Sequence, residues 1–217
     1  MIDRKLILPK KDKKGNSRLS YSQIKCFKEN KREYIKRYIL KEGFYVNKYM
    51  SFGTKVGKAI ETNCYKNFSE IEKESLLKVK RLDEFEKFTT LDFGGFIMYG
   101  YIDSCSLDMN NIIDYKTGSL GKHEKYLKSD YTQLHYYALS LRQKYGITPT
   151  SAQVNYIIRE GNPYKGIILR VSKEKPILID IDISEKTLNR VYWDTIEIAK
   201  EIESFYLKYI ETNNSID

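Results

Sequence analysis

Two largely apolar stretches in the middle of the chain, 96–107 and 112–115, are separated by the residues 108–111, Asp-Met-Asn-Asn. Asp and Asn tolerate the left-handed backbone of tight turns, so this pattern predicts a β-hairpin. Because alternate residues of a strand share a face, Asp114 and Lys116 are expected to lie side by side on the second strand, with the residue between them on the other face.

Four stretches are expected to form helices, mainly because apolar residues recur at three- and four-residue steps. The first covers 20–39 and starts with Ser20, a residue type that caps helices. The second covers about 50–68 and the third about 130–145. The last is a long closing helix that follows Ser184.

Further strands are expected on both sides of the hairpin. A segment with spaced aromatic residues, 81–90, precedes it, and 152–159, 166–171 and 177–183 follow it. The residues 160–164, Glu-Gly-Asn-Pro-Tyr, are a strong turn signal between two of these strands. The chain is therefore a mixture of helices and strands, in the order helices, hairpin, helix, strands and helix.

Length and composition suit one soluble globular domain. The chain has 217 residues, of which 41% are hydrophobic and 31% charged, and the domain is expected over 18–212. No apolar run has membrane-spanning length, and the N-terminus lacks the apolar core of a signal peptide. A cytoplasmic protein without a membrane partner is expected.

The net charge is +9, which favours a polyanionic partner such as DNA. A solubilising lysine-rich surface explains the same surplus, and charge alone leaves both interpretations open. The segment 1–17 is expected to be a basic, flexible lead-in. Its lysines suit either a solvated tail or an arm that lies on a phosphate backbone; they are Lys10, Lys11, Lys13 and Lys14.

The three cysteines, Cys26, Cys64 and Cys105, include no Cys-x-x-Cys pair. This argues against a disulfide scaffold, a zinc site and an iron–sulfur cluster. The chain also lacks the glycine-rich phosphate loops of dinucleotide-binding domains and of ATPase motors.

The hairpin brings two carboxylates and a lysine together. Asp103 belongs to the first strand, and Asp114 and Lys116 belong to the second. Carboxylate oxygens are the ligands that Mg²⁺ and Mn²⁺ prefer. The hairpin is therefore a candidate metal site with an ammonium group beside it.

The spacing of these groups resembles a known family. Asp103, ten intervening residues and Asp114-x-Lys116-Thr-Gly resemble the core of the PD-(D/E)XK nuclease superfamily. The sequence Gly-Tyr-Ile-Asp around Asp103 and a downstream Gln133-x-x-x-Tyr137 are similar to its RecB-like exonuclease branch. A lone Asp-x-Lys carries little weight, whereas four ordered elements cover most of the chain. The resemblance implies an α/β, restriction-endonuclease-like sandwich with a mixed central β-sheet flanked by helices.

The resemblance also implies roles for individual residues in metal-assisted phosphodiester hydrolysis. Lys116 would position the attacking water and neutralise the phosphorane, and Gln133 would orient the water or a phosphate. Asp103 and Asp114 act in catalysis through the metal. The expected ligands of one or two Mg²⁺ (or Mn²⁺) ions are Glu61, Asp103, Asp114 and the carbonyl group of Tyr115.

One motif departs from the family pattern. RecB-like nucleases have Gly-x-x-x-His followed by a carboxylate one helical turn later. Here Gly53 and Glu61 match, but Gly57 stands at the histidine position. This difference implies an altered metal preference or a weakened activity.

Several residues are candidates for DNA contact. Cations on the helix over 20–39 suit a groove wall, although Glu29 and Glu33 also fit an ordinary surface face. A polar loop over 118–130 carries further lysines beside the expected site. The candidates are Lys28, Arg32, Lys122, Lys125 and Tyr137.

Three functions stay open. The resemblance favours a stand-alone exonuclease of the type that phages and mobile elements use in DNA recombination or replication. An endonuclease, structure-specific or defensive, fits the same fold. A non-catalytic DNA-binding or assembly protein with a degenerate site is the third. A homo-oligomer or a recombination partner protein is compatible with each, and no residue demands one.

Overall fold

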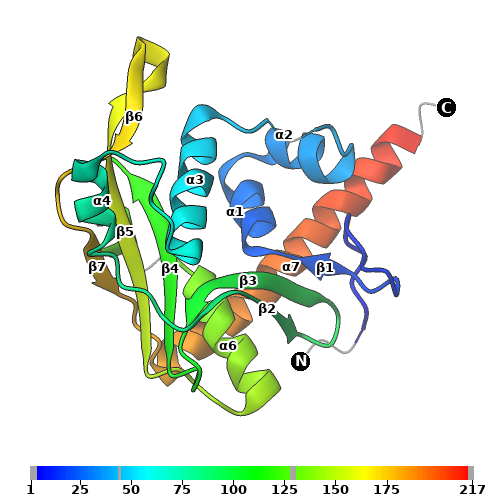
Figure 1. The fold of residues 1–217 in the computed structure, drawn as a ribbon. Coiled ribbons are helices and arrows are strands. Elements are labelled where there is room, and N and C mark those ends of the chain that lie inside the picture. The colour runs from blue at the N-terminus through cyan, green and yellow to red at the C-terminus, as the bar shows by residue number, and fades with distance from the viewer. Residues whose placement is uncertain (1–3, 44, 128–130, 215–217) are drawn as a thin grey trace.

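The computed structural model describes residues 4–43, 45–127 and 131–214, and Figure 1 shows how their helices and strands are arranged. The described strands form one seven-stranded sheet. They are β1 (Arg18–Leu19), β2 (Glu84–Asp92), β3 (Ile97–Cys105), β4 (Asn111–Gly118), β5 (Ser151–Asn162), β6 (Ile167–Val171) and β7 (Ile177–Asp180).

The sheet is mixed. Its main path is β1-β3-β4-β5-β6, with β2 paired to β3 and β7 paired to β5. The pairs β1–β3 and β4–β5 are parallel, and the other four pairs are antiparallel. The predicted fold class, a mixed α/β sandwich, is confirmed.

The predicted hairpin consists of β3 and β4, in which Ser104 pairs with Ile113. Asp108 organises the turn, because its carboxylate accepts hydrogen bonds from the Asn110 amide and the Ser106 hydroxyl. The Asp and Asn residues therefore stabilise the turn through hydrogen bonds of their side chains. The residue with left-handed backbone is Met109, at φ 60°, and not one of them.

Helices cover both faces of this sheet (Figure 1). On one face, α3 and α4 pack on Ile157 and Val171. On the other, α1, α6 and α7 enclose a larger core that includes Tyr156 and Ile158 of the same strand. The helices are α1 (Tyr21–Glu29), α2 (Lys31–Tyr34), α3 (Lys48–Thr62), α4 (Glu70–Leu76), α5 (Glu124–Leu127), α6 (Gln133–Tyr145) and α7 (Glu185–Asn214), with a π-helix at Ile35–Ile39 and a 3-10 turn at Pro163–Lys165.

The expectation of one helix over 20–39 is wrong. Ser20 caps α1 as predicted, but Asn30 has extended backbone and ends this helix. The Asn30 side chain then accepts a hydrogen bond from the Glu33 amide and starts α2. Asparagine is among the best N-cap residues, so the apolar stripe continues across a break in the helix. Similarly, α3 ends at a left-handed Asn63 rather than continuing to 68.

Two residues of the expected lead-in over 1–17 pack into the core of the described structure. Leu6 and Leu8 are buried in the larger core. The Leu6 amide donates to the carbonyl of Gly95, and the Ile7 amide donates to the carboxylate of Glu203 in α7. Two alternating leucines supply enough apolar surface to hold the segment on the sheet. Residues 1–3 of the expected lead-in lie outside the described residues.

None of the helices in the described ranges combines the length and apolarity needed to cross a membrane.

Candidate active site

The hairpin places the three predicted charged residues together. The side chain of Asp114 is fully buried, and the ammonium group of Lys116 lies 2.8 Å from its Oδ1 and 2.7 Å from its Oδ2. Tyr115 points to the other face and packs against the smaller core. Its backbone amide donates a 2.8 Å hydrogen bond to Oδ2 of Asp103. The predicted alternation along β4 is confirmed.

Burial and mutual charge shift the pKa of two of these groups. Burial, and after it the negative charge of Asp114, raises the pKa of Asp103 to about 7. Burial alone would lower the pKa of Lys116, but the carboxylates of Asp114 and Asp103 outweigh it and the pKa is raised. Lys116 is therefore a cation throughout the neutral range, and two carboxylates compete for its charge.

The start of α6 adds three polar groups to this cluster. The Tyr131 hydroxyl lies 2.6 Å from Oδ2 of Asp114 and 2.9 Å from Oε1 of Gln133. Its single proton goes to the carboxylate, which is the stronger acceptor. The Gln133 amide nitrogen donates to the Tyr137 hydroxyl at 2.7 Å, which turns the amide oxygen toward Lys116, 3.4 Å away. Gln133 and Tyr137 are thus one helical turn apart and directly bonded.

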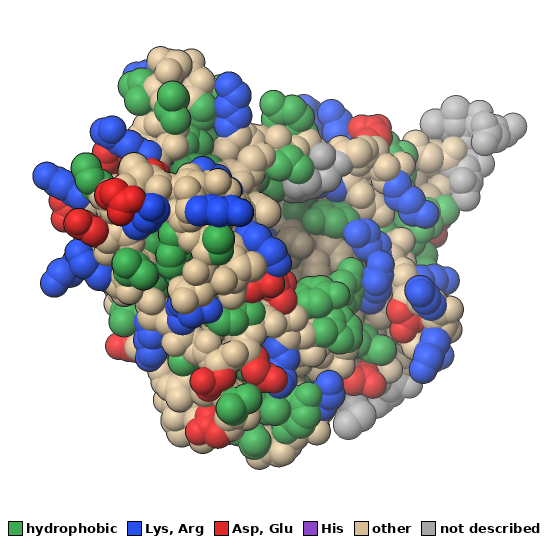
Figure 2. All heavy atoms as spheres, viewed as in Figure 1, with side chains coloured by type: hydrophobic (Ala, Val, Ile, Leu, Met, Phe, Trp, Pro, Cys, Tyr) green, Lys and Arg blue, Asp and Glu red, His purple; other side chains and the backbone are tan. Residues whose placement is uncertain are grey.

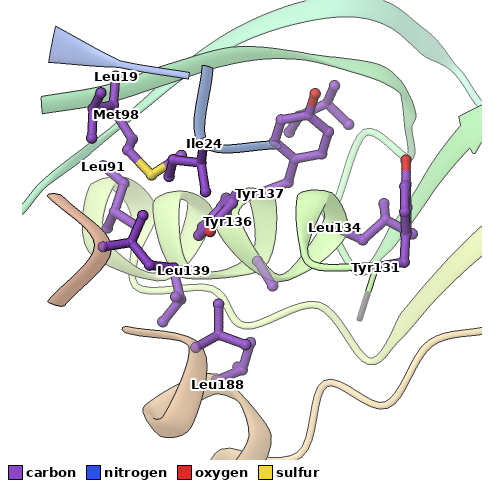
Figure 3. Packing of buried hydrophobic residues seen from close by; sticks show 14 of the residues in the cluster. Leu19, Ile24, Leu91, Met98, Tyr131, Leu134, Tyr136, Tyr137, Leu139 and Leu188 are labelled. Carbon is purple, nitrogen blue, oxygen red and sulfur yellow. The ribbon is translucent and has the colours of Figure 1, made fainter. Parts of the chain in front are cut away.

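The apolar side of α6 fixes the position of these groups. Leu134 and Leu139 are buried in the larger core. Figure 3 shows Leu139 beside Leu188 of α7, and Leu134 beside Tyr131, which lies just before the first turn of α6. Gly100 of β3 makes room for the ring of Tyr137, because a Cβ there would lie 2.9 Å from Cε1 of that ring.

The cluster opens into a cavity of about 940 Å³ between α3 and α1, at the hollow in the centre of Figure 2. Asp103, Lys116 and Gln133 line this cavity, whereas Asp114 lies behind Lys116 and is fully buried. Glu61 also lines it, and its carboxylate is 2.8 Å from the ammonium group of Lys58.

Gly57 lines the same cavity, and a Cβ added there would meet no heavy atom within 4 Å. The space next to Gly57 is therefore open, in the cavity that Glu61 and Asp103 also line.

Sequence reasoning missed Glu86 on β2. The register pairs Phe85 with Ser104 and Lys87 with Ile102, so Glu86 lies opposite Asp103. It lines the cavity with left-handed backbone, φ 50°, a conformation that costs roughly 1 kcal/mol or more for a residue with a side chain. Burial and the charge of Glu61 raise the pKa of its carboxyl group. In the sequence, the charged residues of β2 are the one signal that could have indicated a role for Glu86.

A second cavity of about 1220 Å³ continues from the first along α1 and β3. The two share Tyr21, Lys25 and Gln133 in their walls. The larger one also contains tyrosines and cations from several elements: Lys10, Arg18, Arg37, Tyr38, Tyr99 and Tyr137. Together the cavities form one groove that passes the charged cluster.

The residues expected to contact DNA are distributed unevenly. Tyr137 lines the larger cavity and Lys125 lines the smaller one. Lys28, Arg32 and Lys122 are exposed and line neither. Within the stretch 20–39, the cations that line the groove are Lys25 of α1 and Arg37 of the π-helix.

Among the residues that the structure describes, no three His, Cys, Asp or Glu side chains form a group that could hold a metal ion. The hairpin offers two carboxylates, and Lys116 and Tyr131 already bond to one of them.

No model of a known protein family matches the chain, and no curated protein matches it. Among solved structures, a presumed exonuclease from Eubacterium rectale aligns with 88% of this chain and 82% of its own length, at a TM-score of 0.59 and 12% identity. The two chains share a fold. The structure of SSO0001 aligns with 87% of this chain and 78% of its own length, at 17% identity and a TM-score of 0.42. The mixed α/β sandwich described above is accordingly shared with a solved structure.

Proposed function

We propose that the protein is a metal-dependent DNA nuclease of the RecB-like PD-(D/E)XK type, which hydrolyses phosphodiester bonds. The observation that carries this proposal is the presence of Asp103, Lys116 and Gln133 in the wall of a groove, with Asp114 buried directly behind Lys116. The cluster has the residue types that metal-assisted phosphoryl transfer needs, and it lies on a fold shared with a presumed exonuclease.

Two carboxylates suffice for the metal that we propose. Mg²⁺ in phosphoryl-transfer sites keeps several waters and is held by only one or two carboxylates, so Asp103, Asp114 and the carbonyl group of Tyr115 are an adequate donor set. A carboxylate offers about four lone-pair positions, which leaves Asp114 one position besides those taken by Lys116 and Tyr131. Glu61 and Glu86 lie in the same cavity and would bind through water. The bound ion would act as a Lewis acid and lower the pKa of its water.

The surrounding residues would position the reactants. Lys116 remains protonated, so it would donate hydrogen bonds to the attacking water and to a phosphoryl oxygen as negative charge develops there. Gln133, with its amide fixed by Tyr137, would accept a hydrogen bond from the same water. Both groups are held on rigid elements, β4 and α6, which favours precise alignment.

We propose an exonuclease acting in phage or mobile-element recombination or replication. The fold shared with a presumed exonuclease supports this mode. The test is a Mg²⁺-dependent digestion of linear duplex, linear single-stranded and covalently closed circular DNA.

Loss of linear DNA with circles intact supports an exonuclease, and cutting of circles supports an endonuclease instead. Lys116→Ala is the catalytic blank, and Lys186→Ala, an exposed lysine of α7 away from both cavities, is its matched control. Cleavage that persists in Lys116→Ala, or that survives EDTA, contradicts the proposal.

A further inference from the structure

Two cations lie side by side at the end of the larger cavity that is remote from Asp114. Lys10 and Arg18 are on adjacent extended segments, and the Arg18 amide donates to the Lys10 carbonyl at 3.0 Å. β1 then joins Arg18 to β3, the strand that carries Asp103. The pair is thus held by backbone hydrogen bonds rather than by flexible loops.

Neither cation has an anionic partner in the described part of the chain. No described carboxylate forms an ion pair with either of them. The Nε atom of Arg18 is buried without a hydrogen-bond partner, and such a group costs about 1–3 kcal/mol when it stays unsatisfied. Burial and the charge of Arg18 lower the pKa of Lys10. Two neighbouring cations without an anionic partner favour the binding of an anionic ligand.

Aromatic faces support both cations. The ammonium group of Lys10 lies 4.9 Å from the ring centroid of Tyr38, and the guanidinium group of Arg18 lies 4.7 Å from that of Tyr99. These contacts orient the charges without neutralising them. Of the carboxylates that line this cavity, Glu33 pairs with Arg37 and Glu29 lies 3.9 Å from Lys25. The third, Glu42, is exposed and forms no ion pair with Lys10 or Arg18.

The cavity connects this pair with the proposed catalytic centre. Its lining runs from Lys10 and Arg18 past Tyr99 to Tyr137 and Gln133. Pockets of roughly 300–1,000 Å³ enclose one ligand of drug size, so a cavity of about 1220 Å³ suits a few nucleotides of one strand rather than a duplex. Cationic grooves with aromatic side chains are also how proteins bind single strands without sequence preference.

We propose that Lys10 and Arg18 together bind a backbone phosphate of single-stranded DNA that lies in the larger cavity and reaches Gln133 at its other end. This inference rests on the proposed nuclease function, because it identifies single-stranded DNA as the substrate of that site. Lys10 of the basic lead-in and Arg18 of β1 would then both contact the bound strand.

The test is binding of a fluorescent 20-nucleotide single strand and of the matching duplex, measured by anisotropy in EDTA. Without a divalent metal, the readout is independent of cleavage. The variant Lys10→Gln/Arg18→Gln is compared with Lys186→Gln/Lys208→Gln, which removes two exposed charges of α7 outside both cavities. Because the charge change is equal, a difference between the variants reports position rather than net charge.

The Lys10/Arg18 variant is expected to bind the single strand about four- to tenfold more weakly at 0.15 M salt, with a salt slope that is smaller by about 0.7 for one lost phosphate contact. The α7 variant is expected to change affinity less than twofold. Lys10→Glu, which leaves Arg18 in place, is expected to give a similar loss at an unchanged melting temperature.

Equal effects of the two double variants, or tighter binding of the duplex by the wild type, overturn the inference. Cleavage of DNA with either result leaves the proposed nuclease function standing. The expected binding results without any metal-dependent cleavage support the strand-binding site and contradict the nuclease instead.

Discussion

The ammonium group of Lys116 contacts both oxygens of Asp114, at 2.8 and 2.7 Å, and the carboxylate that it neutralises is fully buried. Removal of the lysine leaves an uncompensated charge in the interior, because among the described residues only the Tyr131 hydroxyl still bonds to the carboxylate. We expect Lys116→Ala to lower the free energy of unfolding by about 3 kcal/mol, in the range for a broken buried pair, and to abolish cleavage. Urea unfolding and DNA digestion measure the two effects.

The double variant Asp114→Asn/Lys116→Gln separates stability from catalysis. Two neutral amides in place of the ion pair leave no buried charge, so most of the lost stability is expected to return while cleavage stays absent. Recovered cleavage in this variant contradicts the roles proposed for the pair.

The hydroxyl of Tyr137 fixes the Gln133 amide by accepting a 2.7 Å hydrogen bond. In Tyr137→Phe the amide is free to rotate, so we expect the rate constant for cleavage to fall about tenfold, equivalent to a loss of about 1.4 kcal/mol, with a loss of stability of about 1 kcal/mol. Tyr136→Phe is the control, because that hydroxyl bonds to Thr195 in the core instead. Equal loss of cleavage in both variants argues for a general packing effect of α6.

The hairpin was predictable from the sequence because its determinants are local. The Asp and Asn residues of the turn and the alternation along β4 both act within a few residues. The helix break at Asn30 was missed because the apolar stripe continues beyond it, although an asparagine followed three residues later by glutamate also suits a new N-cap.

The rest of the site depends on contacts between distant segments. Glu86 reaches the cavity through its pairing with β3, and Tyr131 reaches Asp114 from just before α6. Neither belongs to a motif. Likewise, Lys10 lines the groove because Leu6 and Leu8 anchor the N-terminal segment in the core. The many lysines of that segment suggested a solvated tail instead.

Replacement of Gly57 by alanine tests whether a side chain fits at this position. It lies in the interior of α3, where glycine costs about 0.8–1.0 kcal/mol relative to alanine, and an added Cβ meets no atom within 4 Å. We expect Gly57→Ala to raise the free energy of unfolding by about 0.5–1 kcal/mol. Gly53→Ala is expected to gain less, because its Cβ would lie 3.3 Å from Oγ1 of Thr117. Thermal unfolding of both variants measures the difference, and an equal or reversed order contradicts it.

The carboxylate of Glu203 links the C-terminal helix α7 to the N-terminal segment of the chain. It accepts hydrogen bonds from Arg4 at 2.8 Å and from the Ile7 amide at 2.6 Å, and its side chain is only 5% exposed. The hydrogen bond with Arg4 lowers the pKa of this carboxyl group below its usual value of 4.5. The unfolded state therefore binds the proton more readily, so the stabilisation is complete at pH 7 and is lost as the pH falls through the folded pKa.

The variant Glu203→Gln is expected to be less stable than the wild type at pH 7, because the neutral amide bonds Arg4 more weakly. The difference should shrink between pH 5 and pH 3, where the wild-type carboxylate takes up its proton. Urea midpoints at pH 7, 5, 4 and 3 measure this convergence. Glu197→Gln is the matched control, since Glu197 lies on the same helix but pairs only with Lys200 at the surface. A Glu203→Gln difference that stays constant down to pH 3 contradicts the linkage, because the lost stabilisation would then not depend on the charge of this carboxylate.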